Sequence, residues 1–441
     1  MRPAAPAARR APTGTASRAA AIALLEAVLG RRRTLEEALE GLPALEARDR
    51  AFAHRLAATV LRRLGTLDAV LEPLLRRPPP EPVRHALRLG AAQLLLLGTP
   101  AHAAVSATVA TVGTLPKGRA FAGLANAVLR RLAAKGPAAL EGLDGPRLDT
   151  PDWLWRAWHA GYGPAAARAI AEANAREAPL DLTLKPELDP LEWAARLGAE
   201  VLPTGSLRLA APSRAVAALP GYEAGAWWVQ DAAAALPARL LRPHPGERVA
   251  DLCAAPGGKT AQLAAAGAAV TAVEASAERA RRLADNLARL RLNADIVVAD
   301  ALGWGAAHAF DSVLIDAPCT ATGTIRRHPD IPHLKRPRDL GPLVETQTRL
   351  LAAAARLVRP GGRVVPGGRV VYAVCSLQPE EGEGVVAAAE ALALAPDPIQ
   401  AEEVPGLAEA ITPRGQLRTL PSLWPERGGL DGFFVARFVR R

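Results

Sequence analysis

The stretch RVADLCAAPGGKT, residues 248–260, decides the fold of this chain. Residues 248–254 have the pattern of a short buried strand, and AAPGGKT (254–260) is a glycine-rich turn that leads into a helical pattern. This order predicts an α/β unit that holds its ligand at the carboxyl end of the strand. The turn lacks the GxGxxG spacing of dinucleotide-binding proteins, so the sequence does not favour a dehydrogenase.

Further strands follow along the C-terminal part. Four apolar segments have a strand pattern: AVTAVEA (269–275), ADIVVAD (294–300), FDSVLIDAP (310–318) and RVVYAVCS (369–376). Because helical patterns lie between most of them, we predict a parallel, doubly wound, Rossmann-like α/β sheet. The closing DGFFVARFV (431–439) predicts a last strand that runs antiparallel.

The rest of the chain divides by composition. Residues 1–15 are basic and rich in Pro and Ala, which predicts a disordered tail. Residues 16–138 have helical periodicity, with a capping box at Thr34 and Glu37. Residues 145–235 combine a tryptophan-rich helix, whose rings we expect to pack in a core, with short alternating segments of a small α+β module. The α/β domain is expected over 236–441.

Charge and cysteine content narrow the function. The net charge is +10 with a pI near 10.3, which favours a polyanionic partner such as nucleic acid or an anionic membrane face. Composition alone does not choose between these two partners. The longest apolar runs, such as 94–97, are far too short to cross a bilayer, so we expect no membrane association. Cys253, Cys319 and Cys375 form no CxxC pair or Cys/His cluster. We therefore expect no metal, and free thiols in a reducing cytoplasm, although an isolated cysteine is more often an inert core residue.

Acidic residues end three successive strands of the predicted sheet. Glu274, Asp300 and Asp316 would surround a crevice of nucleoside size, and their charge argues against a ligand rich in phosphates. S-adenosylmethionine (SAM) fits this crevice. The glycines let the backbone approach the methionine part of SAM, the helix N-terminus favours its carboxylate, and Asp251 could bind its amino group. The expected cofactor contacts are Cys253, Ala254, Ala255, Pro256, Gly257, Gly258, Lys259, Glu274, Asp300 and Asp316.

Together with AAPGGKT, four motifs resemble one family: DAPC (316–319), IRRHPDI (325–331), VCS (374–376) and PEE (379–381). They are similar to those of the RNA cytosine-5 methyltransferases (NOL/NOP/Sun family), in particular the bacterial RsmB (Sun/Fmu) type that modifies 16S rRNA. The resemblance covers nearly the whole chain. It implies a multidomain protein with an all-α NusB-like RNA-binding domain, a small α+β RRM-like module and a class I SAM-dependent methyltransferase domain.

The resemblance also implies roles for the site residues. Cys375 would be the nucleophile, Cys319 the base that aids release, and Asp316 the residue that holds the N3/N4 edge of cytosine. Lys259 would contact the base or sugar. Phosphate or base contacts are expected from Arg326, Arg327 and His328, in a protein that works as a cytoplasmic monomer on small-subunit rRNA.

Methylation of cytosine at C5 requires two different functions of a thiol. Cytosine C5 is a poor nucleophile, but a thiolate that adds to C6 makes C5 enamine-like, which divides one hard step into two easier ones. The C5 proton must then be removed so that the sulfur can leave. Since C5 is inaccessible in a stacked helix, the target nucleotide must be unpaired or flipped out.

Three departures from the family pattern bear on this interpretation. PGGRVV occurs twice, at 360–365 and 366–371, and we predict that the second copy pairs in the sheet while the first bulges. Val374 stands where the family has threonine, and Leu184-Lys185 where it tends to have arginine and asparagine. A DNA methyltransferase that uses Cys319 as nucleophile, a cytosine-5 methyltransferase of tRNA or 23S rRNA, and a non-catalytic ribosome assembly factor remain alternatives.

Overall fold

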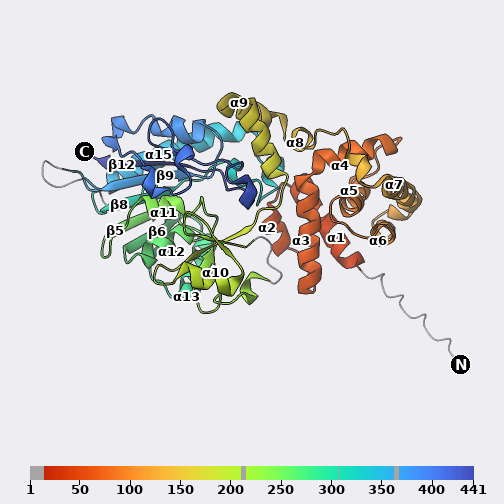
Figure 1. Cartoon of the computed structure of the whole chain (residues 1–441), viewed down its shortest axis with the longest axis horizontal. Helices are drawn as coiled ribbons and strands as arrows, with labels where there is room; N and C mark the ends of the chain where they lie inside the picture. The colour runs from red at the N-terminus through yellow and green to blue at the C-terminus, as the bar shows by residue number, and fades with distance from the viewer. Residues whose placement is uncertain (1–13, 210–214, 306, 362–366) are drawn as a thin grey trace. The chain divides into compact units, whose positions relative to one another are not determined.

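The computed structural model describes residues 14–209, 215–305, 307–361 and 367–441. They form two compact units (Figure 1). Within the described ranges, the first unit comprises 14–155 and His328–Lys335, and the second comprises Arg156–Arg327 and Arg336–Arg441. A short return segment of the C-terminal half therefore belongs to the N-terminal unit.

The first unit is helical. Its helices are α1 (Thr15–Leu25), α2 (Leu35–Glu40), α3 (Ala47–Arg62), α4 (Leu64–Leu71), α5 (Glu81–Leu95), α6 (Ala101–Thr114), α7 (Ala122–Lys135) and α8 (Gly145–Leu148). The apolar face of each longer helix enters one core, in which Leu24, Leu56 and Leu87 are fully buried. At Gly90 in α5 an added Cβ would lie 2.7 Å from the end of the Leu129 side chain of α7, so a larger residue would force that side chain to shift.

The return segment completes the helical unit. It contains α14 (Ile331–Leu334), and the carboxylate of Asp330 accepts a hydrogen bond of 2.9 Å from the backbone N–H of Leu35, the first residue of α2. The predicted capping box at Thr34 and Glu37 is confirmed at the same helix start. The first turn of α2 thus has its free N–H groups satisfied by residues far apart in the sequence.

The second unit begins with a small antiparallel sheet. Its strand order is β2 (Glu200–Val201), β3 (Leu207–Leu209), β1 (Leu180–Leu184), β4 (Trp227–Val229), and α9 (Asp152–Asn174) and α10 (Pro190–Leu197) belong to the same region. Of the tryptophans predicted to pack, Trp158 is almost fully buried, which confirms its role, whereas Trp153 and Trp155 are half-buried. β3 is one of the short strands expected in this module, and the residues that follow it, 210–214, lie outside the described residues.

The larger sheet carries the site. Its order is β10 (Leu394–Pro396), β12 (Phe434–Arg440), β9 (Arg369–Val374), β8 (Ser312–Asp316), β5 (Arg248–Leu252), β6 (Ala269–Glu274), β7 (Asp295–Val298), and β11 (Leu417–Arg418) pairs with β12. The five strands from β9 to β7 are parallel and β12 is antiparallel. The accompanying helices are α11 (Leu236–Leu240), α12 (Gly258–Ala265), α13 (Ala277–Leu290) and α15 (Leu340–Leu357).

The strand order indicates where the sheet binds a ligand. After β5 the chain runs outward to β6 and β7, and it then returns to β8 and β9 on the other side of β5. Strand order therefore reverses at β5, and the carboxyl end of the strand at such a point is where open α/β sheets bind ligands.

These observations confirm the predicted fold class and the antiparallel last strand. The second PGGRVV copy supplies Arg369–Val371 to β9, as predicted. The bulge predicted for the first copy falls largely on 362–366, and the disordered tail on 1–13, both outside the described residues. Among the described residues, no helix is long and apolar enough to span a membrane.

Candidate active site

The glycine-rich turn lies at the switch point of the sheet. It leaves β5 at Cys253, whose φ of 62° is left-handed, and Ala254 is held to β6 by a hydrogen bond of 3.1 Å to the carbonyl of Val273. Gly257 is the N-cap of α12 and has a φ of 102°, a backbone conformation that residues with a side chain rarely adopt. The turn therefore directs the N-terminus of α12 toward the carboxyl edge of the sheet, where a carboxylate is favoured.

Asp251 offers a site for a cationic group. Its side chain is fully buried at the end of β5; Oδ2 accepts a hydrogen bond of 2.6 Å from Thr260, whereas Oδ1 has no hydrogen-bond partner. Burial raises the pKa of Asp251 to about 7, against the Thr260 hydrogen bond and with the help of the Asp316 charge. A buried carboxylate oxygen without a partner fits an amino group such as that of SAM.

The predicted ribose ligand Glu274 ends β6 and is 2% exposed. One of its oxygens accepts from the backbone N–H of Ala255 at 3.3 Å and the other from Ser276 at 3.0 Å. The oxygen bound to Ser276 keeps a second lone pair for a ribose hydroxyl, whereas the oxygen bound to Ala255 also pairs with Arg279 at 3.4 Å. Asp300 lies beyond the end of β7, is exposed, and accepts from the N–H of Leu302 at 3.0 Å.

The first of the three cysteines, Cys253, lies in the turn itself and is half-buried, like the other two. The pKa of the Cys253 thiol is raised to about 12 by burial, with further contributions from the carboxylates of Asp316 and Glu274. Cys253 therefore stays protonated and fits a wall of the cofactor crevice better than a reactive group.

Lys259 and Asp316 form an ion pair at the mouth of the site. Nζ of Lys259 lies 2.7 Å from Oδ2 of Asp316 and 5.3 Å from the ring centroid of Phe433. Burial by itself lowers the pKa of Lys259, but Asp316 outweighs this and the net pKa is raised. The ammonium therefore stays charged in a site that has excluded most water.

The two remaining thiols converge. Sγ of Cys319 and Sγ of Cys375 lie 3.5 Å apart although 56 residues separate them. Cys375 follows β9, Cys319 follows β8, and the N–H of Gly323 donates to the carbonyl of Cys375 at 3.0 Å. The parallel pairing of Asp316 with Ala373 brings the two strand ends level, which explains why the loops meet.

The surroundings of Cys319 raise the pKa of its thiol. The hydrogen bond to Cys375, burial and the nearby charges of Cys375 and Glu381 raise the pKa of Cys319 well above its usual value. The thiol of Cys319 therefore keeps its proton and can donate it in a hydrogen bond to the sulfur of Cys375.

The three residues expected to contact RNA are Arg326, Arg327 and His328. Arg326 is 1% exposed, and its guanidinium group pairs with Asp231 at 2.6 Å and Asp431 at 2.7 Å. Arg327 pairs with the same two carboxylates at 2.6 and 3.1 Å. These arginines tie together loops of the second unit, so their geometry goes against a phosphate contact. His328 is exposed and belongs to the helical unit.

A buried polar network, which the sequence did not predict, lies beside the thiols. It comprises Thr320, Thr322, Gln347, Ser376 and Glu381. The PEE motif pointed to Glu381 only as a family feature, because nothing in the local sequence indicates that this carboxylate is buried.

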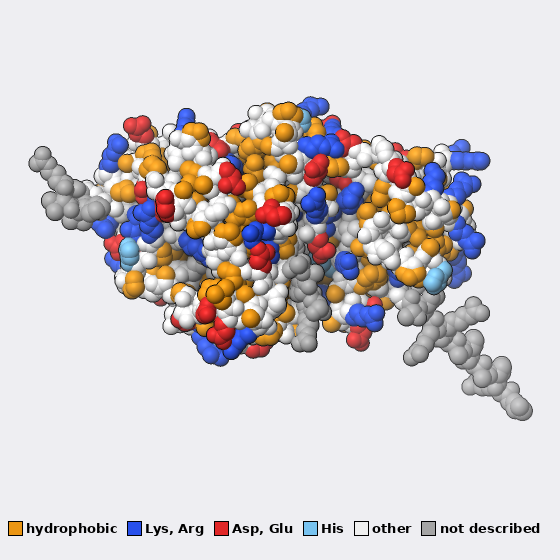
Figure 2. Space-filling view, in the orientation of Figure 1, with side chains coloured by type: hydrophobic (Ala, Val, Ile, Leu, Met, Phe, Trp, Pro, Cys, Tyr) orange, Lys and Arg blue, Asp and Glu red, His pale blue; other side chains and the backbone are white. Residues whose placement is uncertain are grey.

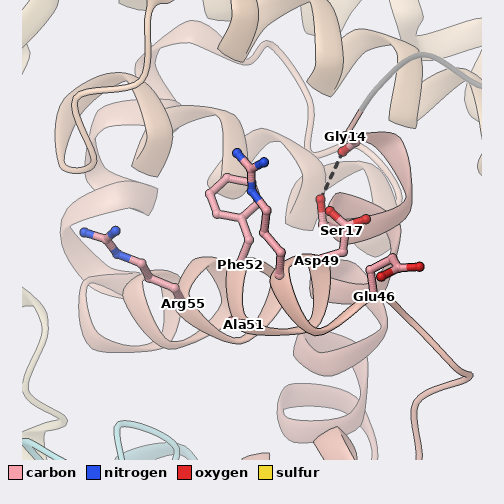
Figure 3. Close-up of a pocket in the computed structure, with 8 residues that line it drawn as sticks. Gly14, Ser17, Glu46, Asp49, Ala51, Phe52 and Arg55 are labelled. Atoms are coloured by element: carbon pink, nitrogen blue, oxygen red, sulfur yellow. Dashed lines mark hydrogen bonds between the residues drawn. The ribbon is translucent and has the colours of Figure 1, made fainter. Parts of the chain in front are cut away.

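Another cavity lies in the helical unit. It measures about 740 Å³ and is lined by Gly14, Ser17, Glu46, Arg48, Asp49, Ala51, Phe52 and Arg55 (Figure 3). It holds charges of both signs and no thiol, so it does not resemble the site of a methyl transfer. In the part of the chain that the structure describes, no group of three His, Cys, Asp or Glu side chains is arranged to hold a metal ion.

Fold and site together define a class: a Rossmann-like, SAM-dependent methyltransferase with a pair of thiols at the carboxyl edge of its sheet. The family model described as 16S rRNA methyltransferase RsmB/F matches residues 238–439, and that of the NusB family matches residues 15–134. The chain belongs to the RsmB/F family of 16S rRNA methyltransferases.

Individual proteins agree with this assignment. Ribosomal RNA small subunit methyltransferase B of Xylella fastidiosa (strain 9a5c) is 38% identical, over 95% of this chain and 98% of that protein. The protein of the same name from Sodalis glossinidius is 36% identical, over 90% of this chain and 92% of that protein. The crystal structure of a methyltransferase homologue from Pyrococcus horikoshii is 26% identical with a TM-score of 0.53, and covers 65% of this chain and 94% of that one.

Proposed function

We propose that this protein transfers the methyl group of SAM to C5 of a cytosine in 16S rRNA, through a covalent bond between Cys375 and C6. The observation that carries the proposal is the separation of 3.5 Å between Cys319 and Cys375. A single pyrimidine ring presents C6 to one sulfur and the C5 proton to the other only if both sulfurs lie within a few ångströms of each other.

The first step belongs to Cys375. Its thiolate adds to C6, a C–S bond forms, and the electron pair of the C5–C6 double bond becomes available at C5. Asp316 accepts a hydrogen bond from the amino group of cytosine, and Lys259, 2.7 Å from Asp316, holds that carboxylate in place. SAM, when bound, supplies an electrophilic methyl group.

The last step belongs to Cys319. As a base it removes the C5 proton; the electrons of the C–H bond rebuild the C5–C6 double bond, and the C–S bond breaks to return the electron pair to Cys375. The hydrogen bond and charge of Cys375, both causes of the raised pKa of Cys319, are absent while Cys375 is bound to C6. The thiol of Cys319 therefore ionises more readily in the adduct than in the resting enzyme, and once its own proton has passed to solvent the thiolate accepts the C5 proton.

The cofactor would be held by the turn 253–259 together with Glu274, Asp300 and Asp316, with its amino group on Asp251. The unpartnered Oδ1 atom of Asp251 supports this assignment. The glycines of the turn let the backbone approach the methionine part of SAM, and the carboxylates exclude a phosphate-bearing ligand of similar size.

Surface charge supports an RNA substrate. Figure 2 shows many Lys and Arg side chains on the helical unit. Among its exposed residues are Arg76, Arg77, Lys117, Arg119, Arg130 and Arg131. We propose that the protein acts as a monomer in the cytoplasm, since its mechanism needs free thiols and a reducing compartment keeps them so.

The test is direct. The full-length protein is incubated with SAM labelled in the methyl group and with deproteinised 16S rRNA, and the modified nucleoside is mapped. We expect one 5-methylcytosine. Label in tRNA or 23S rRNA alone, or none in any RNA despite SAM binding, would overturn the proposal.

A further inference from the structure

Glu381 is a buried carboxylate without a cationic partner. It lies in the π-helical turn η8 (Glu380–Gly384), five residues after Ser376, and its side chain is fully buried. None of the ion pairs among the described residues involves it. Burial of a carboxylate is costly unless hydrogen bonds replace its lost hydration, so the bonds it makes indicate what it does.

Four donors from three segments converge on this carboxylate. Oε1 accepts from the backbone N–H of Thr320 at 2.8 Å and from Nε2 of Gln347 at 3.0 Å. Oε2 accepts from the hydroxyl groups of Thr320 and Ser376. Thr320 directly follows Cys319, and Ser376 directly follows Cys375. One side chain therefore binds the residue next to each thiol.

Further bonds tie the same two loops together. The N–H of Leu377 donates to the hydroxyl of Thr322 at 2.9 Å. The hydroxyl oxygens of Thr320 and Ser376 are in contact at 3.1 Å, but this is not a further hydrogen bond, because each hydroxyl proton is donated to Glu381. Gln347 of α15 also donates to the carbonyl of Pro318, the residue before Cys319, at 2.8 Å. Glu381 lies at the centre of this network, and a glutamine could not accept from the same four donors, because an amide has a single oxygen.

We propose that Glu381 is a positioning residue for methyl transfer: its carboxylate fixes the loops after Cys319 and Cys375 and so sets the separation of the two sulfurs. This inference rests on the proposed roles of the thiols, and it concerns how they are held. The charge of Glu381 also contributes to the raised pKa of Cys319.

A purely structural carboxylate would affect stability alone. A positioning carboxylate also affects the turnover number and the reactivity of the two thiols, while it leaves cofactor binding unchanged. A misplacement of about 1 Å at a reacting group costs about a hundredfold in rate.

The experiment compares full-length Glu381→Gln and Thr320→Val with the matched control Glu380→Gln, whose side chain is exposed. Thr320→Val keeps the carboxylate and removes one of its donors. We measure kcat and KM on 16S rRNA, the SAM dissociation constant, and the alkylation rate of each cysteine against pH by mass spectrometry of the RNA-free protein.

We expect Glu381→Gln to lower kcat about a hundredfold and Thr320→Val about tenfold, with KM and SAM affinity within about twofold. Glu381→Gln should also shift the alkylation profile of Cys319 to lower pH. Wild-type kcat together with a wild-type alkylation profile in Glu381→Gln would overturn the inference. If the wild-type protein methylates no RNA, the proposed function fails, whereas the RNA-free alkylation profiles still test the role of Glu381.

Discussion

Nζ of Lys259 lies 2.7 Å from Oδ2 of Asp316, and the pair joins the glycine-rich turn after β5 to the strand end of β8. The lysine is about 10% exposed and the aspartate about 31%, so the pair is only partly screened by solvent. It therefore connects the cofactor turn to the residue proposed to hold cytosine.

This pairing predicts coupled effects of substitution. We expect Lys259→Met to lower kcat/KM for rRNA at least about tenfold, because Asp316 loses the partner that orients it. The double variant with Asp316→Asn should be little worse than the poorer single variant, since both remove one interaction. Fully additive losses in a double-mutant cycle would show that the two residues act independently.

The thiol pair predicts opposite outcomes for two similar substitutions. Cys375→Ser should abolish methyl transfer, because no adduct forms at C6. Cys319→Ser should form the adduct and fail to release it, so that a slow-migrating protein–RNA band accumulates on a denaturing gel with SAM present. If Cys319→Ser is the variant that fails to form any adduct, Cys319 is the nucleophile and the assignment must be reversed.

Because the pKa of the buried Asp251 carboxyl is raised, cofactor binding should depend on pH. That pKa is about 7, so a carboxyl that is largely protonated at pH 6 must lose its proton to bind an ammonium group. Binding therefore releases a proton, and affinity for SAM should rise roughly tenfold between pH 6 and pH 8 and level off above. Calorimetry across this range checks the slope, and Asp251→Asn should bind weakly with a flat profile.

The helical unit should lose stability in acid. Burial, together with the charges of Arg88 and Arg84, lowers the pKa of His85 from 6.5 to about 4. Because the unfolded chain binds the proton more readily, the stabilisation is present above pH 6.5 and is lost as pH falls to about 4, by at most about 3 kcal/mol. Denaturant unfolding of His85→Gln should show a weaker dependence over this window, whereas His102→Gln, an exposed control in α6, should follow the wild type.

Local sequence determined a large part of this protein. The turn AAPGGKT, the strand-ending residues Glu274 and Asp316, and the capping box at Thr34 depend on short-range rules of backbone conformation and hydrogen bonding, so their patterns could be interpreted directly. The strand pattern also placed Cys319 and Cys375 at the same edge of the sheet, because parallel strands share their carboxyl ends.

Tertiary structure alone decided which polar groups find partners. Arg326 and Arg327 looked available to RNA, but Asp231 and Asp431, about a hundred residues away in each direction along the chain, neutralise them in the fold. Glu381 likewise gained its role from Thr320, 61 residues before it. Burial and long-range pairing set the free energy of a charged group, and neither is encoded in its immediate neighbours.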